Sequence, residues 1–167
     1  RQEGSEKFRN LRNGNGKRDY TIWVANLQGR IGAGRRPLTL GFDLMHNAED
    51  YASAKDAFAA ATRDEKDGFL VSAHWGATGR RNDWQVGYYY VRIETLALNA
   101  AFAQDDWTRW GSATQTDSSD FKGHELRFTY VPLNNRTTVV ARLYLTEGVT
   151  SNVQDGRRFR VDLNTSF

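Results

Sequence analysis

The last ten residues of the chain read Arg158-Phe159-Arg160-Val161-Asp162-Leu163-Asn164-Thr165-Ser166-Phe167. One set of alternate positions carries Phe, Val, Leu, Thr and Phe, and the other carries Arg, Arg, Asp, Asn and Ser. Successive side chains of a β-strand point to opposite faces of the sheet. The alternation therefore predicts a strand with one apolar and one polar face.

Six further segments repeat this alternation, and they are spread over most of the chain. They are residues 20–31, 38–45, 69–76, 84–93, 124–132 and 138–146. The contrast between the faces weakens near Arg92 in the fourth segment and at Val140 and Tyr144 in the sixth. A single short apolar run is ambiguous, but seven in series predict an all-β chain of antiparallel strands.

The connections between these segments alternate in length. Reading back from the end of the chain, they are 147–157, 133–137, 94–123, 77–83, 46–68 and 32–37, in the order longer, short, long, short, long, short. Membrane barrels of bacteria have short periplasmic turns and longer extracellular loops. The alternation predicts an antiparallel transmembrane β-barrel portion over residues 20–167, with residues 1–19 as a loop or leading segment. Within 46–68, residues 47–62 are expected to form an N-capped surface helix of about three turns.

The composition is compatible with this architecture. The mean hydropathy is −0.69, and no apolar run approaches the ~20 residues of a membrane helix. A membrane strand of ~10 residues is apolar only at every second position, so it averages out as polar.

Cysteine is absent, which excludes disulfides, thiolate metal ligands and cysteine nucleophiles. The formal charge of +3 is too small to indicate a nucleic-acid partner.

The C-terminal stretch resembles the terminal strand of Gram-negative outer-membrane proteins, which ends in Phe after alternating apolar residues. The stretches 81–88, 122–126 and 161–164 are similar to a poorly characterised porin family. The resemblance covers residues 68–167. It implies a location in the bacterial outer membrane, contact with outer-membrane lipid, and recognition of the C-terminal strand by the barrel-insertion machinery. It implies no catalytic residues.

The number of strands has a consequence for the whole barrel. Single-chain bacterial barrels have an even number of strands and both termini in the periplasm. Seven strands with a periplasmic C-terminus place Arg1 outside the cell. We therefore expect about seven strands of a larger barrel here, with the remaining strands supplied by a missing segment or a second chain. An eighth strand within residues 6–11 is the alternative.

The polar phase of the strands is expected to face the lumen. The candidate pore-lining residues are Arg30, Asp43, His74, Glu125, Arg127, Arg142, Arg158, Arg160 and Asp162. Arginine outnumbers acidic residues in this set, and rings of arginine favour the passage of anions. The prediction is a mild anion preference, and the alternative is a packed lumen in which these charges pair with one another.

The opposite phase is expected to face lipid. It includes Trp23, Leu27, Leu40, Phe42, Val71, Val86, Phe128, Leu143, Val161 and Leu163. Amphipathic rings suit the headgroup region of a membrane. An aromatic belt beside the short turns is therefore expected from Trp75, Trp84, Tyr130 and Phe167.

No catalytic residue, metal site or cofactor is expected. The three histidines do not have metal-ligand spacing. Ser72 and His74 share the lumen phase, whereas a barrel lipase would need a Ser–His pair on its outer surface, and Gly-x-Ser-x-Gly is missing. Four aspartates of the longest loop could hold Ca²⁺, but a solvated acidic loop is the favoured interpretation: Asp105, Asp106, Asp117 and Asp120.

Together these patterns predict a porin-like channel for passive diffusion of small hydrophilic solutes, and not an enzyme. Two alternatives stay open. One is a structural sleeve that houses or anchors a partner protein across the outer membrane. The other is a soluble β-barrel or sandwich that binds a small apolar ligand.

Overall fold

The structure is a computed structural model of the chain, and it describes residues 20–32, 34–54, 57–98, 107, 119–133, 136–150 and 155–166. Residues 1–19 and Phe167, to which the sequence assigned a leading segment and a place in the aromatic belt, lie outside the described residues. So do Asp105, Asp106 and Asp117 of the longest loop.

The described chain is built almost entirely of β-strands. They are β1 (Ile22–Ile31), β2 (Leu38–Asn47), β3 (Asp67–Gly76), β4 (Trp84–Ile93), β5 (Phe121–Tyr130), β6 (Thr137–Gly148) and β7 (Gly156–Thr165), with one short helix, α2 (Ala57–Ala61), between β2 and β3. Six strands have 10 residues and β6 has 12. Strands in globular proteins average about 5–6 residues, so these are unusually long and uniform.

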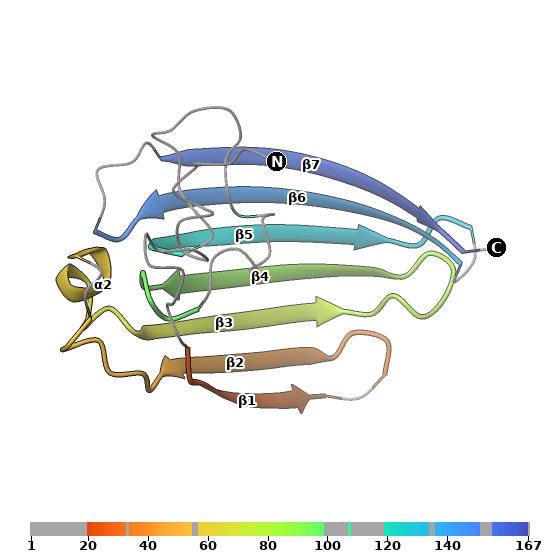
Figure 1. Cartoon of the computed structure of the whole chain (residues 1–167). Helices are drawn as coiled ribbons and strands as arrows, with labels where there is room; N and C mark the ends of the chain where they lie inside the picture. The colour runs from red at the N-terminus through yellow and green to blue at the C-terminus, as the bar shows by residue number, and fades with distance from the viewer. Residues whose placement is uncertain are drawn as a thin grey trace.

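The seven strands form one antiparallel sheet in sequence order, β1 to β7 (Figure 1). Each strand pairs with the next in the chain, as expected for a meander. The predicted all-β class and the seven antiparallel strands are confirmed. The sheet is not closed into a barrel, because β1 and β7 do not pair with each other.

The connections lie at two ends of the sheet, which differ in character (Figure 1). The short-turn end carries the turns 32–37, 77–83 and 131–136, and the loop end carries 48–66, 94–120 and 149–155. The predicted alternation in length holds for the first five connections. It fails for the last, because β6 and β7 both extend into the predicted loop 147–157 and leave a connection no longer than the turn 77–83.

The three short turns are joined by hydrogen bonds. Gly76 N donates to Pro37 O at 3.1 Å, which ties the first turn to the second. Asn82 N donates to Val131 O at 2.8 Å, and Val131 N donates to Asp83 O at 3.0 Å. Val131 therefore pairs with the turn that precedes β4 and is not part of β5. β5 ends at Tyr130 rather than at the predicted residue 132.

The predicted helix over 47–62 is much shorter in the structure. Regular helix is restricted to Ala57–Ala61, and Ala52 N binds the Asp50 side chain instead in a local turn. Asn47 is not a helix cap, since it is the last residue of β2. Its buried amide nitrogen donates to Leu96 O at 2.8 Å and Tyr51 Oη at 2.9 Å.

Candidate functional site

The register of the ladders sorts the side chains onto two faces. Direct cross-strand partners lie on the same face, and neighbours along a strand lie on opposite faces. All nine predicted pore-lining residues share one face, which we call the polar face: Arg30, Asp43, His74, Glu125, Arg127, Arg142, Arg158, Arg160 and Asp162. That these residues line a pore stays a prediction.

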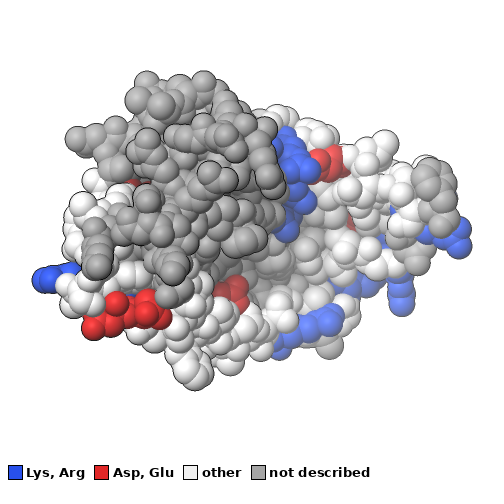
Figure 2. Space-filling model, in the orientation of Figure 1, with Lys and Arg blue, Asp and Glu red and all other residues white. Residues whose placement is uncertain are grey.

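The polar face carries an ion-pair network across β5, β6 and β7. Arg127 Nε donates to Glu125 Oε1 at 2.6 Å, and Arg142 Nε lies 4.0 Å from the same oxygen. On its other side, Arg142 Nη1 lies 3.2 Å from Asp162 Oδ2, and Arg160 Nε donates to Asp162 Oδ1 at 2.7 Å. Two carboxylates are thus shared among three guanidinium groups. On the side of the molecule seen in Figure 2, a group of basic atoms adjoins acidic atoms.

Aromatic rings continue this network towards the middle of the sheet. The Arg127 guanidinium lies 4.5 Å from the centre of the Tyr89 ring. The same Tyr89 ring meets the His74 ring edge-on, with 4.9 Å between the two ring centres. Further along the same face, Asn26 Nδ2 donates to the Asp43 carboxylate across β1 and β2. Charged and hydrogen-bonding groups therefore line the polar face from β1 to β7.

The loop end of the polar face is covered by an apolar cluster. It consists of Val91, Ile93, Ala97, Trp107, Phe121 and Tyr144. The Trp107 ring meets Tyr144 edge-on at 5.2 Å and lies 6.1 Å from Phe121. This explains why Tyr144 interrupts the sequence alternation: it is on the polar face but is buried by a residue of the β4–β5 connection. The breaks in phase near Arg92 and at Tyr144 are the signals of this cluster in the sequence.

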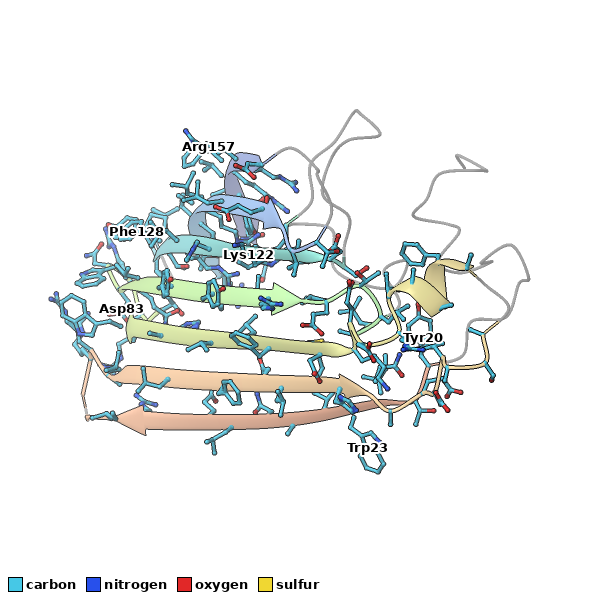
Figure 3. The ribbon with its side chains drawn as sticks, turned by 90° about the vertical axis from the view of Figure 1, so that its left-hand side faces the viewer. Tyr20, Trp23, Asp83, Lys122, Phe128 and Arg157 are labelled. Carbon is cyan, nitrogen blue, oxygen red and sulfur yellow. The ribbon has the colours of Figure 1, made fainter. Side chains whose placement is uncertain are left out.

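The other face, which we call the apolar face, is exposed. All ten residues predicted to face lipid lie on it: Trp23, Leu27, Leu40, Phe42, Val71, Val86, Phe128, Leu143, Val161 and Leu163. Among the described large apolar residues that are exposed, all but Ile22, Val24, Phe58 and Leu133 lie on this face. Trp23, Phe128 and Arg157 of this face point away from one another in Figure 3, as on the convex side of a curved sheet.

Aromatic rings border the apolar face at the short-turn end. Trp84 pairs directly with Tyr130, and the Trp75 and Trp84 rings meet edge-on at 5.1 Å. The Arg36 guanidinium lies 4.5 Å from the centre of the Trp84 ring. Three of the four residues predicted for an aromatic belt therefore stand together, and the fourth, Phe167, is outside the described residues.

Pairs of oppositely charged residues border the apolar face at its loop end. Lys122 Nζ lies 3.2 Å from Glu147 Oε2, and His46 Nδ1 lies 2.7 Å from Asp67 Oδ1. Arg92, where the sequence alternation weakens, also lies in this border and pairs with Glu94 at 3.2 Å. On β3, β4 and β5, no Asp, Glu, Lys or Arg lies between the two borders of the apolar face.

Other chemistry finds little support in the described residues. They hold no group of three or more His, Asp or Glu placed to bind a metal ion. No helix among them is long and apolar enough to cross a membrane. Ser72 and His74 share the polar face, as their spacing predicted. His74 meets Tyr89 there, and the Ser72 side chain lies over Gly41.

Comparison of the chain with protein-family models, with curated proteins and with solved structures found no match.

Proposed function

We propose that this chain forms part of the wall of an outer-membrane β-barrel, a porin-like channel through which small hydrophilic solutes diffuse passively. The observation that carries the proposal is the apolar face, which is continuous over seven strands and exposed. Monomeric soluble proteins rarely expose a contiguous apolar patch of more than a few hundred Å². Hydrocarbon is the environment in which such a face is stable.

The dimensions of the apolar face suit a bilayer. Its two borders lie eight residues apart on three neighbouring strands, at Asp67 and Trp75, Trp84 and Arg92, and Lys122 and Tyr130. Eight residues span about 26 Å along a strand, or about 20 Å in height at a tilt of ~40°. The apolar band of outer-membrane barrels is ~25 Å tall. The strand length of 10 residues also falls within the ~9–11 of a membrane strand.

The polar face suits a water-filled lumen. Its arginines and carboxylates, together with His74, Asn26 and Tyr89, would be expensive to expose to lipid and are compatible with water. The excess of arginine over acidic residues supports a mild preference for anions. A soluble binder of an apolar ligand would need its apolar phase to line a cavity, whereas here that phase is exposed.

Conductance tests the proposal directly. The full-length protein, purified in detergent and added to a planar bilayer, should produce discrete, step-like increases in current. In a KCl gradient, the reversal potential should have the sign of chloride preference. Detergent extracts from cells without the protein provide the control. A protein that stays in solution without detergent, or that inserts and never conducts, would contradict the channel.

A further inference from the structure

Two short turns that lie side by side, 32–37 and 77–83, are rich in arginine. Their only acidic residue is Asp83, which is buried. Their basic residues are all exposed, and they are Arg35, Arg36, Arg80 and Arg81. In Figure 2 basic atoms lie at the right-hand end of the molecule, which is the short-turn end in Figure 1, and the largest group of acidic atoms lies towards the other end. The two turns therefore present positive charge to their surroundings.

The one carboxylate of the turns is already engaged. Arg35 Nη2 donates to Asp83 Oδ1 at 2.7 Å, and the side chain of Asp83 is only 8% exposed. Arg80 N donates to the other carboxylate oxygen at 2.9 Å. Neither Arg36 nor Arg81 forms an ion pair with a carboxylate in the part of the chain that the structure describes. These two arginines are the cations that an anion from outside could reach.

Arg36 stands where the apolar face ends. Its guanidinium lies 4.5 Å from the centre of the Trp84 ring, and that ring meets the Trp75 ring edge-on at 5.1 Å. Contact with an aromatic ring holds a guanidinium in place, while most of its five N–H donors stay available for other partners. A positioned cation and an exposed apolar surface therefore adjoin each other at this border.

The opposite border of the apolar face is different. Three side chains that are cationic, or become so on protonation, each face a carboxylate there: Lys122 with Glu147, His46 with Asp67, and Arg92 with Glu94. An anion would have to compete with these carboxylates. The short-turn border is therefore the better place for an anion.

A ligand that matches the short-turn border needs a charged part and an apolar part. Guanidinium groups bind phosphate oxygens through paired hydrogen bonds, and the exposed apolar surface beside Trp75 and Trp84 is suited to hydrocarbon. A phospholipid joins these two parts at the depth where tryptophan rings are enriched in membranes. A free phosphate ion would leave the apolar surface uncovered, and an apolar peptide would leave the arginines without a partner.

We propose that Arg36 and Arg81 bind the phosphate headgroup of an anionic phospholipid, whose acyl chains lie on the apolar face beside Trp84 and Trp75. The short turns of an outer-membrane barrel are periplasmic, so this lipid would belong to the periplasmic leaflet. The proposal rests on that part of the proposed function which places the apolar face in a membrane, and it does not require conduction.

Quenching of tryptophan fluorescence by brominated lipids shows which lipid stands beside the border. The full-length protein carries Trp23→Phe, which removes the tryptophan at the other end of the apolar face. This reference protein is refolded into mixed vesicles of phosphatidylcholine and phosphatidylglycerol, in which one lipid or the other is brominated on its acyl chains. The two quenching curves give the preference for the anionic lipid over the zwitterionic one. It should be about fivefold or more, because each arginine at an anionic membrane surface contributes a factor of about five.

Variants of the reference protein locate this preference. Arg36→Gln should lower it by about fivefold. Arg63→Gln is the matched control, since it removes the same charge from a side chain that is 57% exposed in the connection 48–66 at the loop end, and it should leave the preference unchanged. Arg36→Lys keeps the charge without the planar fork and should be intermediate. If circular dichroism shows that Arg36→Gln does not refold, Arg81→Gln takes its place and should lower the preference in the same way.

The outcomes separate this site from the proposed function. If neither brominated lipid quenches the fluorescence, the apolar face is not in the bilayer, and the site and the proposed function are both wrong. If both lipids quench the reference protein equally, the site is wrong and the barrel stands. An equal loss of preference in Arg36→Gln and Arg63→Gln would show a general attraction of charge and overturn the site.

Two further results concern the ligand and the channel. Displacement of phosphatidylglycerol by sodium phosphate at constant ionic strength would make free phosphate the ligand and overturn the lipid. A preference that Arg36→Gln removes, in a protein that never conducts, would support the site and overturn the channel.

Discussion

At the scale of single residues, the two faces differ in where a charge is tolerated. Leu126 lies at the middle of β5 on the apolar face, 50% exposed, and its neighbours Glu125 and Arg127 both belong to the ion-pair network of the polar face. On a water-exposed surface, a charge at Leu126 would cost little. In hydrocarbon it has no partner. A charge at position 126 therefore distinguishes an apolar face in water from one in lipid.

Leu126→Arg should destabilise the protein by about 2–4 kcal/mol in lipid vesicles, the cost of arginine near the midplane of a bilayer. The measurement is urea unfolding followed by tryptophan fluorescence. Gln28→Arg, which adds the same charge to the polar face of β1, is the control and should change stability by less than about 0.5 kcal/mol. Equal stabilities of Leu126→Arg and Gln28→Arg would argue against lipid on the apolar face.

Asp83 is a second residue with a measurable role, in the turn between β3 and β4. The hydrogen bond from Arg35, at 2.7 Å, lowers the pKa of the Asp83 carboxyl below its usual value and outweighs the opposing effect of burial. A hydrogen bond from Arg80 N at 2.9 Å acts in the same direction. The carboxylate thereby links two of the short turns.

This link should make stability depend on pH. Because the folded-state pKa is the lower one, the contribution of Asp83 is fully present above the ordinary carboxyl pKa of about 3.9. It is lost as the pH falls through the lower, folded-state value. Asp83→Asn should therefore lower the melting temperature at pH 7, and the difference from the parent should shrink towards pH 2. A difference that is constant with pH would show that the charge is not involved.

At the scale of elements, the end of β3 depends on one glycine. Gly76 has φ +111°, a conformation that L side chains rarely adopt, and a Cβ there would overlap the Trp84 carbonyl. Because the main chain of Gly76 lies so close to that of Trp84, Gly76 N donates to Pro37 O and Ala77 N donates to Trp84 O. The end of β3 therefore stays hydrogen-bonded to its neighbours where the turn begins. The tryptophans that border the apolar face are positioned by this turn.

Gly76→Ala should cost about 1–3 kcal/mol or more, since both backbone strain and an overlap with main-chain atoms must be relieved. Gly79→Ala in the same turn is the control, because a Cβ at Gly79 meets nothing within 4 Å. The free energies of unfolding of both variants are compared with that of the parent in the same detergent. A Gly79→Ala variant as unstable as Gly76→Ala would refute the role assigned to Gly76.

At the scale of the whole molecule, the open sheet requires a partner if it lies in a membrane. Unpaired backbone groups cost several kcal/mol each in hydrocarbon, so strand edges do not persist there. In a seven-stranded meander, β1 and β7 run in the same direction. Antiparallel closure therefore needs an odd number of further strands between them. We expect these strands to come from outside the residues described.

Cysteine pairs test this expectation, because the chain has no cysteine of its own. Ala141→Cys with Val161→Cys joins direct partners of β6 and β7 and should form a disulfide under mild oxidation. Val161→Cys combined with a cysteine at Ala25, Leu27 or Gly29 of β1 should stay reduced. Efficient bonding between β7 and β1 would reveal a small closed barrel. Its lumen would be filled by side chains, and the channel would be excluded.

The sequence alone determined the strands and their two faces. Side-chain alternation is a local property of an extended chain, so Arg158, Arg160 and Asp162 could be assigned to one face of β7 without any knowledge of its neighbours. The same reasoning placed Trp84 and Tyr130 beside short turns. It misjudged strand ends, such as that of β5, where hydrogen bonds to another turn decide the boundary.

Only the tertiary structure decided which residues of different strands stand opposite one another. A shift of register by two residues keeps every side chain on its face, so the alternation cannot distinguish Arg142 opposite Arg127 from Arg142 opposite Glu125 or Thr129. The observed register aligns Arg127, Arg142 and Arg160 in one row. Burial of Tyr144 by Trp107 depends on contacts between segments far apart in the chain, and for the same reason no local pattern could predict it.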